Sequence, residues 1–192
     1  MAIEIKETFQ VQAPIDAVWR FMLDPRQVVT CMPGAELDEV VDERTFLGSV
    51  KVKLGAVTTS YKGKVTFTRV DAAGHAIAMR AEGRETGGGT AKGSVASRLR
   101  ALPDGRTEVV TEASVDLTGR VMQVGRGMIQ GVSQQLFAQF VASTRARLEA
   151  AASGAAPPLL PAEATPIRVV PLLFRTFWSA LVRFFRRLFP ER

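Results

Sequence analysis

Residues 76–99 read AIAMRAEGRETGGGTAKGSVASRL, and this stretch decides the fold. On both sides of Gly87–Gly89, small or apolar residues alternate with polar ones, a period of two that is typical of a strand with one wet face. The run of glycines between the two halves predicts a turn. We therefore predict an antiparallel hairpin whose inner face carries Ile77, Met79, Ala81, Gly83, Ala91, Gly93, Val95, Ser97 and Leu99.

The same alternation extends in both directions along the chain. From Glu36 to Gly119 it predicts a meander of about six strands, with breaks near Asp42, Gly55, Asp71–Gly74, Gly87–Gly89 and Pro103–Gly105. Inner-face residues rich in Gly, Ala and Ser let a sheet curl tightly, and they leave space that side chains do not fill. The remaining inner-face positions are Phe46, Gly48, Val50, Val52, Thr59, Tyr61, Gly63, Val65, Phe67, Thr111, Ala113, Val115 and Leu117.

Helical patterns flank the meander. A first strand, Ile3–Val11, precedes a helix at Ile15–Leu23 and a second short helical stretch at Arg26–Cys31. A single long helix, about Val121–Ala151, follows the last strand. Strands and helices are segregated along the chain, which favours an α+β fold, a curved antiparallel sheet around one long helix.

The start of the long helix contains Gly125, Gly127 and Gly131. Each glycine costs a helix about 1 kcal/mol relative to alanine, so we expect close approach of a backbone or a ligand there. Tight helix–sheet packing is one interpretation. The other is an apolar pocket for a flat hydrophobic ligand. The predicted pocket residues are Tyr61, Met79, Ala81, Gly93, Val95, Ala113, Val115, Val124, Met128 and Val132.

Residues typical of catalysis are scarce. His75, the only histidine, follows a turn and is expected to be exposed to solvent. Cys31, the only cysteine, is expected to be a small buried hydrophobic residue, and no metal-binding motif is present. Residues 87–93 lack the Gly-Lys-Ser/Thr of a phosphate loop, and residues 125–131 have GxGxxxG spacing, so neither predicts a nucleotide site. We predict no catalytic residues and no metal site.

The net charge of +6 is concentrated in the C-terminal tail. Residues 161–192 carry six Arg and two Glu, so the rest of the chain is nearly neutral, which argues against nucleic-acid binding. Residues 153–171 hold five of the ten prolines and are predicted to be an extended linker.

Residues 172–192 are predicted to form a short amphipathic helix. Its arginines fall on one third of the helical circle, and aromatic and aliphatic residues cover the rest. Arginines near its middle disfavour a membrane span, so the pattern favours a helix lying in the membrane interface, while docking on a protein remains the alternative. The predicted membrane-binding residues are Phe174, Arg175, Phe177, Trp178, Leu181, Arg183, Phe184, Phe185, Arg186, Arg187 and Leu188.

Several segments together resemble the CoxG family of carbon monoxide dehydrogenase proteins over about residues 2–150. The matching segments are Ala13-Pro14-Ile15, Val18-Trp19, Asp24-Pro25, Cys31-Met32-Pro33-Gly34-Ala35-Glu36, Tyr61-Lys62-Gly63, residues 87–93 and Thr118-Gly119-Arg120 before Gly125. The resemblance implies a helix-grip fold of the START/Bet v1-like (SRPBCC) superfamily for residues 1–152. It also implies an accessory role for a molybdenum hydroxylase of the carbon monoxide dehydrogenase type.

In such a role the protein recruits the enzyme to the cytoplasmic membrane. The resemblance further implies that the protein carries a respiratory quinone, menaquinone or ubiquinone, in its cavity. The chain has no signal-peptide pattern, and we expect it at the inner face of the cell membrane, in the cytoplasm. The alternatives are a cyclase- or dehydrase-type enzyme, a general lipid carrier, and a plain membrane tether with a filled core.

Overall fold

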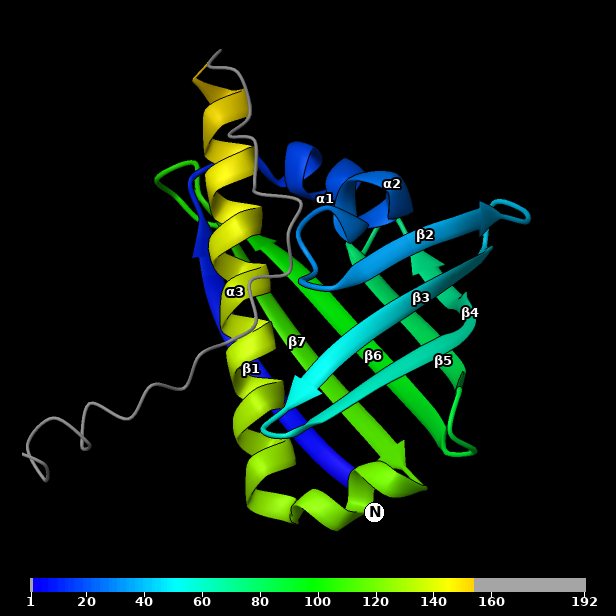
Figure 1. Cartoon of the computed structure of the whole chain (residues 1–192). Helices are drawn as coiled ribbons and strands as arrows, with labels where there is room; N and C mark the ends of the chain where they lie inside the picture. Colours follow the sequence, from blue (N-terminus) through cyan, green and yellow to red (C-terminus); the bar gives the residue numbers. More distant parts are fainter. Residues whose placement is uncertain (1, 154–192) are drawn as a thin grey trace, which may run out of the picture.

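The hairpin at residues 76–99 forms as predicted. Its strands are β5 (Ala76–Glu85) and β6 (Thr90–Ala101), which pair antiparallel with Met79 opposite Val95 and Ala81 opposite Gly93. The computed structural model describes residues 2–153, and within this range the chain forms one curved sheet and the helices packed against it (Figure 1). The predicted α+β class is therefore confirmed.

The sheet has seven antiparallel strands within the described residues, in the order β1-β7-β6-β5-β4-β3-β2. The predicted six-strand meander is confirmed, and the N-terminal strand joins it beside the last strand. The remaining strands are β1 (Ala2–Val11), β2 (Ala35–Val40), β3 (Thr45–Leu54), β4 (Val57–Asp71) and β7 (Thr107–Leu117).

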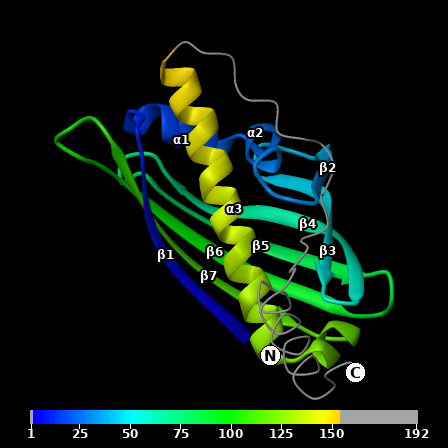
Figure 2. The same cartoon turned by 60° about the vertical axis from the view of Figure 1, so that its left-hand side comes forward.

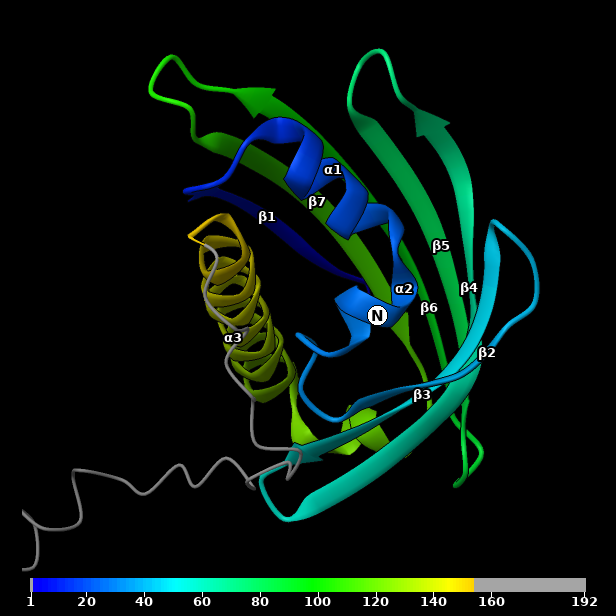
Figure 3. The ribbon, with the colours of Figure 1, turned by 90° about the horizontal axis from the view of Figure 1, so that it is seen from above.

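A row of glycines crosses three neighbouring strands of the sheet, β3, β4 and β5. Gly48 lies opposite Gly63, and Gly63 lies opposite Gly83. A Cβ added to Gly63 would lie 2.7 Å from the Cα of Gly83, closer than real Cβ atoms come. The glycines therefore permit the close approach of neighbouring backbones, and Figure 3 shows the resulting curvature from above.

Two short helices cover one end of the sheet. They are α1 (Ile15–Leu23) and α2 (Pro25–Val29), the second of which starts one residue earlier and ends two residues earlier than predicted. The Asp24 carboxylate caps α2 by accepting a hydrogen bond from the backbone N–H of Arg26 at 2.9 Å. The cap satisfies an amide that the helix itself cannot pair.

The long helix begins later than predicted. Arg120–Val124 forms a 3-10 helix (η1), Gly125 interrupts the chain with φ 86°, and the α-helix α3 spans Arg126–Ala152. The predicted start at Val121 was wrong because the left-handed Gly125 breaks the helical path. A Cβ added to Gly127 or Gly131 would meet nothing within 4 Å, so no other backbone approaches these two glycines closely, and that alternative of the prediction was wrong. The other alternative, approach of a ligand, stays a prediction.

α3 crosses the inner face of the sheet (Figure 2). Its backbone comes close to β1 and to β3, which lie toward opposite sides of the sheet, and approaches the strands between them at isolated points at most. The predicted linker beyond Ser153 and the predicted membrane-binding helix at 172–192 lie outside the described residues.

Two separate hydrophobic cores hold α3 against the sheet. The first core lies under α1 and the C-terminal half of α3 and contains Phe9, Val18, Phe21, Phe67, Ile77, Leu99, Val109 and Leu148. The second lies at the other end of the helix and contains Ile3, Leu54, Val121 and Ile129. The middle of the inner face belongs to neither.

Candidate functional site

An apolar strip lies between the two cores on the inner face of the sheet. It consists of Ala81, Gly93, Val95, Ala113 and Val115, which the strand register brings side by side on β5, β6 and β7. All five residues are only partly buried, although they belong to central strands on the face that carries α3. These small side chains therefore leave part of the apolar surface open, as expected for a ligand-binding face.

The other predicted pocket residues surround this strip. Met79 packs against the first core, and Val124 and Val132 pack against the second. Met128 lies at the rim, because it is 46% exposed and its sulfur lies beside Gly55 in the β3–β4 turn. Tyr61 is buried, at 8% exposure, and extends the site toward the β5–β6 turn.

Tyr61 belongs to a polar cluster on the inner face. The hydroxyl of Thr59 donates a hydrogen bond to Glu85 Oε1 at 2.8 Å, and Glu85 is the direct cross-strand neighbour of Tyr61. Glu85 Oε2 and Tyr61 Oη are both buried and have no hydrogen-bond partner within the described part of the chain. A buried polar atom without a partner typically costs about 1–3 kcal/mol, so this pair of atoms requires an explanation.

Burial raises the pKa of Tyr61 above its usual value of 10.0. The nearby Thr59 hydroxyl acts in the opposite direction, and the negative charge of Glu85 raises the pKa further. The phenol is therefore protonated at neutral pH and can donate a hydrogen bond.

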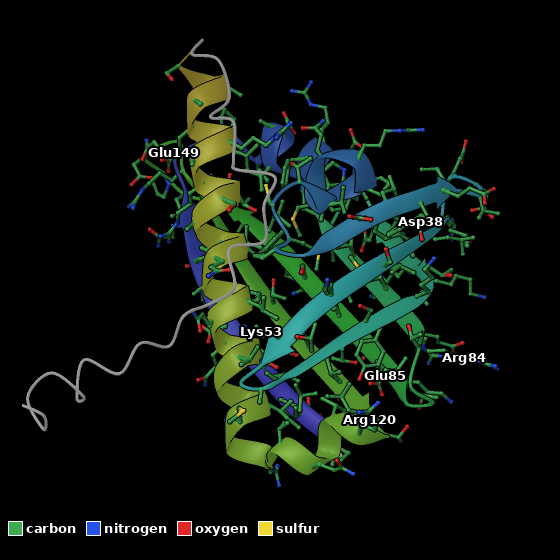
Figure 4. All side chains as sticks on the ribbon, in the orientation of Figure 1. Asp38, Lys53, Arg84, Glu85, Arg120 and Glu149 are labelled. Atoms are coloured by element: carbon green, nitrogen blue, oxygen red, sulfur yellow. The ribbon has the colours of Figure 1, made fainter. Side chains whose placement is uncertain are left out.

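Glycines make room for the Glu85 side chain. A Cβ at Gly89 would lie 2.5 Å from Glu85 Oε2, and one at Gly119 would lie 3.2 Å from it. The Glu85 carboxylate and the Arg120 guanidinium both approach Gly87, since a Cβ there would lie 3.4 Å from Glu85 Oε1 and 3.5 Å from Arg120 Nη1. Figure 4 shows Glu85 and Arg120 at the same end of the sheet, while the neighbouring Arg84 points outward.

Glu85 is missing from the inner-face residues predicted from the sequence. The alternation Ile77, Met79, Ala81, Gly83 continues to Glu85, so one more step of the same period would have found it. A charged residue next to a glycine-rich turn is typical of an exposed loop end. Only the pairing with Tyr61 shows that the strand continues through this position.

The other inner-face polar residues are already paired. Ser97 and Thr111 lie opposite each other, are buried, and share a hydrogen bond of 2.9 Å between their hydroxyls. Because their polar groups are satisfied, they require no ligand.

His75 differs from its prediction, and Cys31 agrees with it. His75 is half-buried with φ 44°, and its ring packs edge-on against Trp19 at a centroid distance of 5.4 Å. The predicted solvent exposure was therefore wrong, since the ring covers part of α1. Cys31 is 2% exposed and belongs to the first core, as predicted.

A basic hollow of about 710 Å³ lies on the outer face of the sheet. Its wall carries Lys62, Lys64, Arg84 and Lys92, together with two carboxylates from the described residues, Asp38 and Glu82. Lys62 and Arg84 are direct cross-strand neighbours, and like charges in that position destabilise a sheet. A second hollow of about 380 Å³ lies near the C-terminal end of α3, beside Gln12 and Glu149.

A curved antiparallel sheet that holds one long C-terminal helix defines the helix-grip, START/Bet v1-like class of protein. Within this class, residues 8–149 match the model of the carbon monoxide dehydrogenase CoxG family, and the chain belongs to that family. The sequence matches none of the curated proteins. None of the helices among the described residues is long and apolar enough to span a bilayer.

Solved structures share the fold at low sequence identity. A conserved protein from Geobacillus kaustophilus superposes with a TM-score of 0.69 at 18% identity, covering 77% of this chain and 95% of its own. The Zhui aromatase/cyclase from Streptomyces sp. R1128 gives 0.57 at 17% identity, covering 81% and 100%. A START superfamily protein from Mycobacterium smegmatis gives 0.52 at 10% identity, covering 76% and 97%.

Proposed function

We propose that the chain is a non-catalytic accessory protein that binds a hydrophobic ligand, a respiratory quinone, between its sheet and α3. In this role it recruits a molybdenum hydroxylase of the carbon monoxide dehydrogenase type to the cytoplasmic membrane. Membership of the CoxG family supports the association with such an enzyme.

The observation that carries the ligand proposal is the partly exposed apolar strip between two closed cores. Each square ångström of apolar surface left in contact with water loses about 25 cal/mol of hydrophobic stabilisation. A folded chain therefore normally covers such a strip with large side chains. Here Ala81, Gly93 and Ala113 are small, and α3 approaches the central strands only sparsely. A flat apolar ring is the complement of a surface made of small residues.

Extraction of the ligand tests this proposal. Full-length protein purified from a quinone-producing host is analysed by native mass spectrometry and by organic extraction. We expect menaquinone or ubiquinone in amounts comparable to the protein. Recovery of a phospholipid or fatty acid in its place would instead support the general lipid carrier.

The outer face provides a surface for the proposed partner. In the basic hollow, Lys62 and Arg84 lie directly across from each other, and their like charges lower the stability of the sheet. An acidic patch on the hydroxylase would relieve this repulsion. The C-terminal tail, with its predicted interfacial helix, then supplies the membrane contact.

One observation favours a cyclase- or dehydrase-type enzyme as a second candidate. Tyr61 and Glu85 are two titratable side chains next to each other on the inner face, as acid–base chemistry requires. The two candidates differ in the fate of the bound molecule. A carrier returns its ligand chemically unchanged, whereas an enzyme converts it, and mass spectrometry of the ligand before and after incubation separates them.

A further inference from the structure

The polar cluster lies next to the apolar strip on the same face of the sheet. Along β4 and β5, the pair Tyr61–Glu85 is followed by the pair Gly63–Gly83 and then by Val65–Ala81, which begins the strip. The glycine pair between them carries no side chains. The Tyr61 side chain lies beside Gly83, since a Cβ added there would be 3.5 Å from Tyr61 Cβ and 3.9 Å from Tyr61 Cδ1. A flat molecule resting on the strip would therefore meet Tyr61 before the rest of the polar cluster.

Three buried side-chain atoms lack a hydrogen-bond partner among the described residues: Thr144 Oγ1 on α3, and Tyr61 Oη and Glu85 Oε2 in the polar cluster. The two atoms of the cluster have complementary hydrogen-bonding needs. Glu85 Oε2 belongs to a carboxylate whose other oxygen already accepts from Thr59, so it needs a donor. Tyr61 Oη carries a proton and needs an acceptor. Although they are cross-strand neighbours, the two side chains do not satisfy each other.

A hydroxyl group satisfies both atoms at once, because it carries one donor and two acceptor lone pairs. A carbonyl oxygen accepts from Tyr61 but leaves Glu85 unpaired. An ammonium group donates to Glu85 but cannot accept from Tyr61. A hydroxyl on a flat apolar ring therefore fits both atoms while its ring rests on the strip, and a buried water can take the place of the hydroxyl when no ligand is bound.

We propose that Tyr61 and Glu85 bind the ring hydroxyl of the ligand and thereby favour the hydroquinone over the quinone. This inference rests on the proposed function and deepens it by assigning the polar end of the site and its preferred redox form. The hydroxyl donates to Glu85 Oε2 and accepts from Tyr61 Oη, and no bond is made or broken. A charged acceptor strengthens such a hydrogen bond relative to a neutral one.

The test compares two probes, menadione and its reduced form menadiol, under anaerobic conditions with the full-length protein. Titration calorimetry gives the Kd of each. We expect menadiol to bind on the order of tenfold more tightly than menadione, which corresponds to one charge-assisted hydrogen bond.

Matched variants assign the effect to the two residues. Glu85→Gln should reduce the menadiol preference to less than about threefold, because the amide can donate to a carbonyl. Tyr61→Phe should weaken both probes alike, since each offers it an acceptor oxygen. Glu82→Gln changes a carboxylate on the outer face of the same strand and should leave the preference intact. Thermal unfolding verifies that each variant is folded.

The outcomes separate this inference from the proposed function. If the wild type binds both probes equally and Glu85→Gln changes neither, the polar site is refuted while quinone binding stands. If the wild type binds neither probe, quinone binding itself is refuted. If Glu85→Gln does not fold, the wild-type preference and the Tyr61→Phe variant still decide the question.

Discussion

Tyr61 and Glu85 lie directly opposite each other in the β4–β5 ladder, and each carries a buried oxygen without a hydrogen-bond partner in the described residues. Neighbouring polar groups inside a protein normally pair, because an unpaired buried group loses its hydration without compensation. Here a donor on Tyr61 and an acceptor on Glu85 remain unpaired, and Glu85 Oε2 lies beside Gly89 and Gly119.

The titration of Tyr61 can be followed directly, since it is the single tyrosine of the chain. We expect the phenolate absorbance to appear with a pKa above 10.0, because burial disfavours the charged form. The Glu85→Gln variant should titrate at a lower pH than the wild type, since the neighbouring negative charge is gone. A tyrosine that titrates as in the unfolded chain would contradict the buried position.

The same shift predicts how stability depends on pH. Tyr61 has a higher pKa in the folded than in the unfolded state, so its contribution is complete below about pH 10 and is lost as the pH rises through the folded value. In urea unfolding the wild type should therefore lose stability relative to Tyr61→Phe as the pH rises above about 10, because only the wild type carries a buried group that ionises there. Parallel pH profiles of the unfolding free energy for the two proteins would contradict a raised pKa of Tyr61 in the folded state.

Two glycines should respond to alanine in opposite ways. Gly63→Ala places a Cβ against the backbone of β5 and should destabilise the fold by roughly 1–3 kcal/mol. Gly131→Ala places a Cβ in open space on α3 and should stabilise it by about 0.5–1 kcal/mol. Urea unfolding measures both, and destabilisation by Gly131→Ala would indicate that α3 is more closely covered there.

The cap of α2 depends on Asp24. Asp24→Ala should cost about 1 kcal/mol, whereas Asp24→Asn keeps an acceptor for the Arg26 amide and should cost less. The side-chain hydrogen bond from Gln27 is the main reason that the pKa of Asp24 is lowered. This stabilisation is present above the unfolded value of 3.8 and is lost as the pH falls through the folded value, so unfolding at acidic pH should bring wild type and Asp24→Asn together.

Reversing a charge in the outer hollow is expected to raise the stability of the fold and to weaken partner binding. Lys62→Glu replaces a like-charge neighbour of Arg84 by an opposite charge and should stabilise the sheet by roughly 0.2–1 kcal/mol. The same change should weaken binding of the hydroxylase on the order of tenfold, more so at low salt.

A charge-matched control accompanies the Lys62 variant. Arg20→Glu makes the same change in charge on the exposed face of α1, away from the hollow, and should leave partner binding unchanged. Pull-down with the purified hydroxylase across a salt series measures both variants. Equal losses of binding for the two variants would indicate that the net charge of the protein, and not the hollow, determines partner binding.

The membrane contact is predicted to reside in the tail alone. Deletion of residues 172–192 should abolish co-sedimentation with anionic liposomes, because the arginines and aromatic residues of the interfacial helix are removed. Circular dichroism should show an unchanged fold for the remaining chain. If the truncated protein still sedimented with the liposomes as well as the full chain, the folded domain, and not the tail, would make the membrane contact.

Much of the fold was predictable because it follows from local periodicity. Alternation in strands such as Ile77–Gly83 assigns side chains to one face whatever lies across from them, and the register confirms that assignment. The α3 start was missed because an apolar period continues through Val121–Val124, while Gly125 adopts a left-handed conformation that periodicity does not report.

The sequence by itself determined the α+β class, the inner face of the sheet and the burial of Cys31, since these depend on the order and spacing of residues in each segment. Tertiary structure alone decided that the hydrophobic core is divided in two, with a partly open strip between the parts. It also decided that Glu85 faces Tyr61 without bonding to it. Both features depend on distances between segments far apart in the chain, which curvature and packing set and which no local pattern encodes.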